Sequence, residues 1–268
     1  MPELDEAVRK YYERGREVDR LQGGLRTGPL EFARTKQLLE RFLPAAPLDI
    51  LDVGGGPGAY AAWLCDRGDR VHVVDPIPLH VEQARAANPR VTGEVGDARD
   101  LHHEDGSVDA VLLLGPLYHL VDPADRLQAL AEARRVLRPG GILMAAAISR
   151  FAGLLDLLVG ELLHEPDVRP VVAAAIETGA FLGTADGLFT TAYFHLPRDL
   201  RAEVAAAGFS AIQILSVEGP GFLVADFERR WADPVQRETM LWAAEVVEAE
   251  PEMLAASSHL LAVAAAPA

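Results

Sequence analysis

Apolar residues in the first half of the chain alternate between two spacings. Short runs rich in branched aliphatic residues predict strands at 48–53, 71–74, 90–95, 108–114 and 142–148. Between several of them, apolar residues at helical spacing predict helices at 59–67, 80–87 and 123–137. Strands that alternate with helices form mainly parallel sheets covered on both faces. The pattern therefore predicts an α/β core.

The pattern changes on both sides of this region. Residues 4–20 are dense in charges of both signs and are followed by Gly23-Gly24, and Gly28-Pro29 begins a helix, because proline suits the first helical position. Two helices are thus expected before the first strand. After residue 148, the expected insertion contains helices at 151–162 and 168–178 and a glycine-rich stretch at 179–187.

The α/β pattern resumes near Pro197, which begins a helix that Gly208 caps. A strand is expected at 209–217, and 259–264 supplies the last strand. A second insertion between these strands contains an acidic helix that begins at Asp233-Pro234. Its spacing predicts a buried face made of Val235, Thr239, Trp242 and Val246.

Composition narrows the class of protein. Hydrophobic residues make up 50% of the chain and charged residues 24%, which is typical of a globular protein. The net charge of −15 disfavours binding to nucleic acid or to anionic membranes. No apolar run is long enough to span a bilayer, and the acidic start does not resemble a secretory signal, so we expect a cytoplasmic protein. The single cysteine, Cys65, excludes an internal disulfide and a zinc site with several thiolates.

The strongest local motif stands where the first strand meets the first core helix. It reads Leu51-Asp52-Val53-Gly54-Gly55-Gly56-Pro57-Gly58-Ala59. Glycines at a strand end let a ligand approach the backbone, and Asp75 at the end of the second strand can accept hydrogen bonds from both hydroxyls of a ribose. A nucleotide-type cofactor is implied. The glycines alone fit NAD as well, although Pro57 removes a backbone N–H that a pyrophosphate would use.

Later motifs favour one of these cofactors. Gly96-Asp97-Ala98 ends the third strand, Leu137-Arg138-Pro139-Gly140-Gly141 precedes the fifth, and Ala206-Ala207-Gly208-Phe209 precedes the sixth. In this order the motifs resemble those of the class I S-adenosylmethionine-dependent methyltransferases, over about residues 48–219 and the last strand. The resemblance implies a Rossmann-like, doubly wound, seven-stranded sheet, mainly parallel, with an antiparallel last strand.

The same resemblance implies how the chain is divided. Residues 1–47 would form a helical lid and 48–148 the cofactor-binding core. Residues 149–194 would be a helical cap over the substrate, and 195–268 would complete the core, with the acidic insertion near 220–257. The residues expected to bind S-adenosylmethionine are Tyr12, Asp52, Gly54, Gly55, Gly56, Gly58, Asp75, Pro76, Ile77, Gly96, Asp97, Ala98 and Leu114.

The acceptor side is less defined by the sequence. The family's amine-methylating members that act on adenine or glutamine carry an Asx-Pro-Pro-aromatic motif, whereas this chain has Gly115-Pro116-Leu117-Tyr118. His119 and His195 are candidates for a catalytic base, because imidazole titrates near neutral pH. The resemblance implies that Glu17 could reach the acceptor, as a further candidate base, and that Arg34 could bind a substrate carboxylate. Tyr118, Phe151 and Tyr193 are expected to line the substrate pocket. The His102-His103-Glu104-Asp105 run is interpreted as a solvated turn, and no metal site is expected.

The sequence thus predicts methyl transfer from S-adenosylmethionine to a small, largely apolar metabolite, at oxygen, nitrogen or carbon. Two alternatives stay open. One is an NAD-dependent oxidoreductase that uses the glycine loop and Asp75. The other is a non-catalytic, cofactor-binding partner protein. The expected assembly is a monomer or a homodimer.

Overall fold

The computed structural model describes residues 4–15, 17–21, 27–182 and 189–268. The expected helix break at Gly23-Gly24 and most of the glycine-rich stretch at 179–187 lie outside these residues. None of the helices described is long and apolar enough to cross a membrane.

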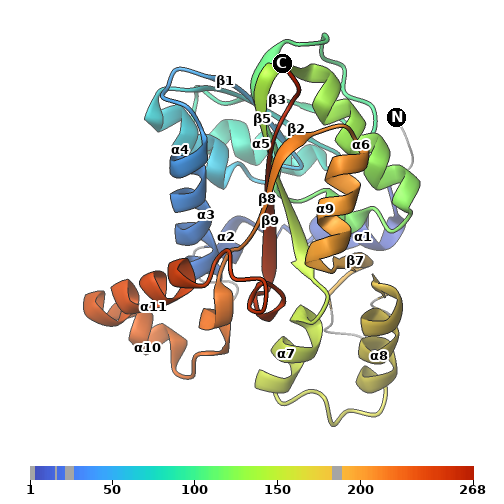
Figure 1. Ribbon diagram of the computed structural model, residues 1–268, viewed down its shortest axis with the longest axis vertical. Coiled ribbons are helices and arrows are strands. Elements are labelled where there is room, and N and C mark those ends of the chain that lie inside the picture. Colours follow the sequence, from blue (N-terminus) through green and yellow to red (C-terminus); the bar gives the residue numbers. More distant parts are fainter. Residues whose placement is uncertain (1–3, 16, 22–26, 183–188) are drawn as a thin grey trace.

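A twisted sheet runs through the middle of the molecule (Figure 1). Its strands lie in the order β3-β2-β1-β4-β5, all parallel, and β9 then pairs antiparallel with both β5 and β8. These are β1 (Asp49–Val53), β2 (Arg70–Asp75), β3 (Thr92–Val95), β4 (Val108–Leu113), β5 (Leu137–Ser149), β8 (Ser210–Ser216) and β9 (His259–Ala265). The prediction of a mainly parallel sheet with an antiparallel last strand is confirmed.

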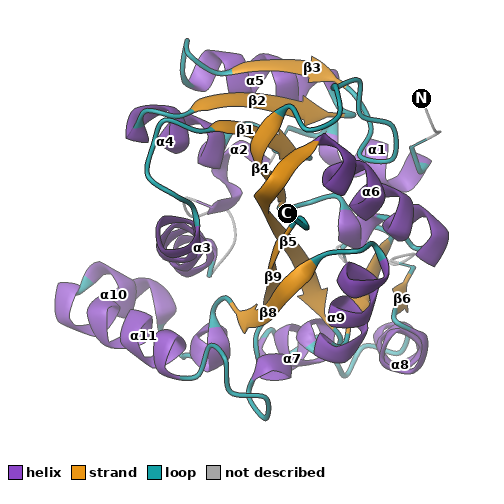
Figure 2. Cartoon of the chain, turned by 45° about the horizontal axis from the view of Figure 1, so that its top comes forward, coloured by secondary structure: helices purple, strands orange, loops and turns teal. Residues whose placement is uncertain are grey.

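Helices cover both faces of this sheet (Figure 2). One face packs against α3 (Gly28–Phe42), α4 (Ala59–Arg67) and α5 (Pro78–Ala87). The other packs against α6 (Pro123–Val136) and α9 (Pro197–Ala206). Leu38, Leu64 and Ala84 contribute to the first apolar core, and Leu130 and Val204 to the second. Burying both faces explains why the central strands are nearly continuous apolar runs.

Two short N-terminal helices precede α3. Helix α1 (Glu6–Tyr12) begins at Asp5, whose carboxylate accepts hydrogen bonds from the backbone N–H groups of Ala7 and Val8. Helix α2 (Glu17–Asp19) is a single turn.

The first insertion contains strands that the sequence pattern did not predict. Helices α7 (Ala152–Val159) and α8 (Val168–Thr178) are present as expected and extend from one end of the molecule (Figure 1). Strands β6 (Ala180–Phe181) and β7 (Ala192–His195) follow, and β7 pairs with the last two residues of β5. A four-residue strand that pairs only at a strand end carries almost no periodic signal.

The second insertion contains η3 (Gly219–Leu223), α10 (Phe227–Ala232), α11 (Pro234–Val246) and η4 (Leu254–Ala256). The predicted buried face of α11 is wrong. Val235, Trp242 and Val246 are 69%, 62% and 60% exposed, and the helix instead buries Met240 and Ala244. These two residues face α10, α3 and η3, so packing against other elements, rather than helical spacing alone, decided which face is buried.

Candidate functional site

A pocket of about 510 Å³ lies at the carboxyl ends of four parallel strands. The segments that follow β1, β2, β3 and β4 all contribute to its lining, as do α1 and the residues after it. In open α/β sheets, ligands bind at this edge because the loops that leave adjacent strands converge there. The pocket is therefore the candidate site.

The glycine turn after β1 forms one wall of the pocket. Gly54 has φ +68°, and a Cβ added there would lie 2.7 Å from Pro116 in the segment after β4. A Cβ on Gly55 would lie 2.6 Å from the carboxylate of Asp52. The turn thus needs glycine both for its left-handed backbone and for its close contacts with two other pocket residues.

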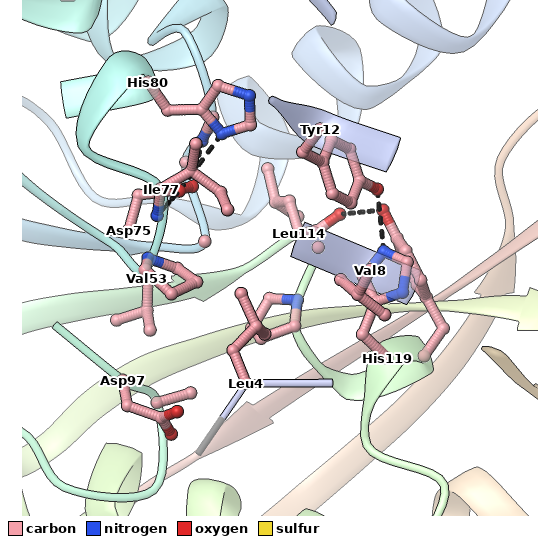
Figure 3. A pocket seen from close by; sticks show the side chains of 18 of the residues that line it. Leu4, Val8, Tyr12, Val53, Asp75, Ile77, His80, Asp97, Leu114 and His119 are labelled. Atoms are coloured by element: carbon pink, nitrogen blue, oxygen red, sulfur yellow. Dashed lines mark hydrogen bonds and ion pairs between the residues drawn. The ribbon is translucent and has the colours of Figure 1, made fainter. Parts of the chain in front are cut away.

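Asp75 ends β2 and holds this turn in place (Figure 3). Its carboxylate accepts hydrogen bonds from the backbone N–H groups of Gly56 (2.9 Å) and Ile77 (2.9 Å) and lies 3.1 Å from Nδ1 of His80. A carboxylate has about four acceptor positions, so one remains for a ligand. The expectation that Asp75 accepts from both hydroxyls of a ribose would require His80 to move.

Asp52 is fully buried, and neither of its carboxylate oxygens has a hydrogen-bond partner among the described residues. Burial, together with the negative charge of Asp75, raises the pKa of Asp52 to about 7. An unpartnered carboxylate is costly inside a protein. A cationic ligand in the pocket would offset that cost.

Asp97, which follows β3, lines the pocket but already has a partner. The Arg99 guanidinium binds both oxygens of Asp97, at 2.9 Å and 2.8 Å, and also lies 2.8 Å from Asp125. The Asp97 carboxylate is thereby fixed in orientation at the pocket wall.

Tyr12 of α1 and His119 of η2 (Leu117–His119) meet at the pocket (Figure 3). The Tyr12 hydroxyl lies 2.7 Å from Nε2 of His119, and Nδ1 of His119 lies 3.1 Å from the backbone carbonyl of Thr191. A carbonyl only accepts, so Nδ1 carries the proton and Tyr12 donates to Nε2. Burial lowers the pKa of His119 to about 4, and the imidazole is therefore neutral at pH 7.

Glu17 lines the same pocket and is paired. Its carboxylate accepts from Nε of Arg20, whose guanidinium also binds both oxygens of Glu31, at 2.7 Å and 3.0 Å. Because its carboxylate is already held by Arg20, Glu17 is a weak candidate for a base.

The pocket is acidic. Its described lining includes eight carboxylate residues and only two arginines, Arg20 and Arg99. Both arginines are bonded to carboxylates. The site thus favours cationic or uncharged ligands over anions.

The structure brings most of the predicted site residues together. The pocket is lined by Tyr12, Glu17, Asp52, Gly54, Gly55, Gly56, Asp75, Pro76, Ile77, Asp97, Ala98, Leu114, Tyr118 and His119. It is not lined by Gly58, Gly96, Phe151, Tyr193, His195 or Arg34.

The residues outside the pocket have other partners. His195 is fully buried, 3.1 Å from Glu203, and Tyr193 lies under the guanidinium of Arg126, 3.7 Å from the ring centroid. Arg34 is fully buried and donates to Glu248. We therefore do not retain His195 as a candidate base or Arg34 as a ligand for a substrate carboxylate.

Gly58, Gly96 and Phe151, which lie outside the pocket, have positions that are explained by local packing and chain geometry. A Cβ on Gly58 would lie 2.7 Å from Ala84, and one on Gly96 would lie 2.6 Å from Val74. Phe151 precedes the first turn of α7. Among the described residues of the first insertion, only Thr191 lines the pocket. The described part of the expected cap over the substrate thus contributes little of the wall.

Sequence reasoning missed several residues of the pocket. Leu4, which precedes α1, and Val8 within α1 both line it, and His80 reaches it from α5 (Figure 3). The position of His80, five residues after Asp75 in the first turn of a helix, was a usable signal, because that turn begins at the carboxyl end of β2. Arg20 gave no such signal, because its position in the pocket depends on how the N-terminal segment passes over the edge of the sheet.

Comparison with known proteins agrees with this geometry. A family model described as "Methyltransferase domain" matches residues 50–141. A methyltransferase of Mycobacterium tuberculosis, described as uncharacterized, is 43% identical over 105 residues, which cover 39% of this chain and 42% of that protein. The ubiquinone biosynthesis O-methyltransferase of Methylocella silvestris is 29% identical over 173 residues, covering 63% of this chain and 60% of that protein.

Among solved structures, an S-adenosylmethionine-dependent methyltransferase from Mesorhizobium loti has a TM-score of 0.57 at 21% identity, and the match covers 88% of this chain and 99% of that one. This likeness shows the fold. The chain spans about two fifths of the length of the mycobacterial relative that it matches.

Proposed function

We propose a function from the premise that this chain belongs to the class I S-adenosylmethionine-dependent methyltransferases: it transfers a methyl group from S-adenosylmethionine to a small, largely apolar metabolite. One observation carries the proposal: Asp52, the glycine turn, Asp75 and the Tyr12–His119 pair all line the same pocket. The Methylocella silvestris relative is named for O-methylation in ubiquinone biosynthesis, which supports a small-molecule acceptor.

The pocket residues fit this cofactor. S-adenosylmethionine carries two positive charges, on its sulfonium and its ammonium group, and the unpartnered carboxylate of Asp52 is a suitable counter-charge. Asp75 retains an acceptor position for a ribose hydroxyl, and Asp97 and Ala98 line the pocket beyond it. Pro57 in the turn withholds one N–H, which matters less for a cofactor without phosphate groups.

When bound, the cofactor would supply a methyl group on a sulfonium, for which a neutral thioether is the leaving group. What the protein must add is alignment of the acceptor with that methyl group and exclusion of water. The Tyr12 hydroxyl donates a hydrogen bond to Nε2 of neutral His119, so its oxygen can accept a hydrogen bond from an O–H or N–H of the acceptor. Tyr12 thereby orients a lone pair of the acceptor atom, and His119 holds Tyr12 in that role.

The charge of the pocket limits the acceptor. The acidic lining favours an uncharged or cationic acceptor over a carboxylate or a phosphate. The same lining and the net charge of −15 disfavour nucleic-acid substrates.

Parallel calorimetric titrations test the proposal. We expect S-adenosylmethionine and S-adenosylhomocysteine to bind with dissociation constants on the order of micromolar, corresponding to about −8 kcal/mol, and NAD not to bind. Binding of NAD alone would overturn the proposal in favour of an oxidoreductase. A panel of neutral, amine and carboxylate acceptors then tests turnover. Cofactor binding without any methyl transfer would instead support a non-catalytic, cofactor-binding partner protein.

Asp52 gives this binding a pH dependence. With a pKa of about 7, Asp52 is mostly protonated at pH 6 and mostly ionised at pH 8. A cationic cofactor selects the ionised form and releases the proton, so affinity for S-adenosylmethionine should rise about tenfold from pH 6 to pH 8. Calorimetry in buffers of different ionisation enthalpy measures the released proton.

The matched control is Asp52→Asn, which has nearly the same shape and does not titrate. This variant should bind the cofactor more weakly at pH 8 and show an affinity that is flat with pH. If the wild-type affinity is also flat, Asp52 does not face the cofactor's positive charge.

A further inference from the structure

A second cluster of chemically competent side chains lies outside the pocket. His72 of β2, Glu94 of β3 and His103 of the segment between β3 and β4 each offer one ligand atom, and these atoms all lie within 4.8 Å of one another. None of the three lines the pocket. His72 and His103 are 31 positions apart in the sequence, and they meet because β2 pairs with β3 and the chain then returns along the sheet.

His72 is held with one nitrogen ready to bind. Its Nδ1 lies 2.9 Å from Oγ1 of Thr92, and that hydroxyl donates to the backbone carbonyl of Val71 at 3.3 Å. Thr92 therefore accepts from Nδ1–H, which leaves the lone pair of His72 on Nε2. This Nε2 atom is buried and has no hydrogen-bond partner among the described residues. A histidine oriented through its other nitrogen is the usual arrangement of a metal ligand.

His103 presents a second unpartnered nitrogen to the same space. Its Nδ1 is buried, lacks a hydrogen bond within the described chain and lies 3.9 Å from Oε1 of Glu94. The two imidazole rings are 5.2 Å apart between centroids. The backbone of His103 is fixed by Arg135, which donates to its carbonyl at 2.7 Å. Two buried imidazole nitrogens without partners are a cost that a bound cation would remove.

From this geometry we infer that His72, Glu94 and His103 form a binding site for a divalent transition-metal cation such as Zn²⁺. Two imidazole nitrogens and one carboxylate oxygen are a ligand set that such cations take, with a remaining position for water. Ligand atoms around zinc are about 3–3.5 Å apart, given bonds of about 2.0–2.2 Å, so the side chains of His103 and Glu94 need to close by roughly 1 Å. Both side chains are partly exposed and can do so.

The site would also connect the β3–β4 segment to the sheet. That segment begins with Asp97, Ala98 and Arg99, which line the pocket, and continues to His103. A cation held by His72, Glu94 and His103 would link the part of this segment around His103 to β2 and β3. A cation that binds only the folded chain raises its melting temperature.

Zinc titration of the chelator-stripped full chain tests this inference. We expect one Zn²⁺ per chain with a dissociation constant on the order of micromolar or tighter, and a rise in melting temperature. With Co²⁺, the same site should give visible absorption bands. His103→Ala and His72→Gln should each weaken binding at least about tenfold and abolish the thermal shift.

The matched control is His102→Ala. His102 is adjacent in sequence and exposed, and it is not one of the three ligands. This variant should bind zinc as the wild type does. The inference is overturned if the wild type binds no Zn²⁺ at 100 µM, or if binding survives both His103→Ala and His72→Gln. His103 lies in a surface segment, so His103→Ala is expected to fold. It therefore still tests zinc binding if His72→Gln fails to fold.

Discussion

Replacing Asp75 with alanine should weaken binding of S-adenosylmethionine about 10- to 100-fold, or roughly 1.5–3 kcal/mol. The free acceptor position of this carboxylate makes a charge-assisted hydrogen bond to the ribose in our proposal, and such bonds are the stronger ones. The same substitution removes the acceptor for the Gly56 and Ile77 N–H groups, so the glycine turn loses its anchor.

Titration calorimetry measures this loss, and thermal denaturation shows whether the variant is folded. Asp75→Asn retains one acceptor oxygen and should lose less affinity than Asp75→Ala. A surface carboxylate serves as control: Asp66→Ala on α4 removes an acid that does not line the pocket and should leave the dissociation constant unchanged. An unchanged constant for Asp75→Ala would remove Asp75 from the cofactor site.

Tyr12→Phe should lower kcat/KM for methyl transfer on the order of 100-fold while cofactor affinity stays within about twofold. The substitution keeps the ring in place and removes only the hydroxyl that is bonded to His119 and that would accept from the methyl acceptor. The expected decrease in kcat/KM therefore reflects poorer alignment of the acceptor. Steady-state kinetics at saturating cofactor, with an acceptor identified in the panel, measures it.

His119→Ala should show a similar loss, because His119 is a positioning residue that fixes the Tyr12 hydroxyl. The double variant should then be little worse than either single one, since both remove one interaction. Because the pKa of His119 is about 4, its neutral form persists throughout pH 6–8, and kcat at saturating cofactor should show no acid limb in that range from this residue. A limb near pH 6.5 that His119→Ala abolishes would contradict this assignment.

The sequence was informative wherever a requirement was local. Helices α4 and α8 lie at the residues that helical spacing indicated, and α9 begins at the expected proline. The glycine turn, Asp75 and Asp97 each directly follow or end a strand, so the meeting of parallel strands at one edge was enough to gather them. Periodicity and strand order therefore predicted the sheet edge at which the pocket lies.

The side of the pocket that we propose for the acceptor depended on contacts between distant segments. His119 and His195 were equally good candidates by residue type, and only the fold separated them, placing Tyr12 against His119 and Glu203 against His195. The buried face of α11 was misjudged for the same reason, because its exposed Trp242 stripe fits helical spacing as well as the buried Met240 does.

By itself, then, the sequence determined the α/β core, its motif order and the edge at which a cofactor would bind. These follow from side-chain periodicity and from backbone requirements that neighbouring residues impose. The tertiary structure alone decided which histidine meets the pocket, which arginines are already paired with carboxylates, and that His72, Glu94 and His103 come together. Each of these depends on the packing of residues far apart in the chain, and local spacing contains no record of such contacts.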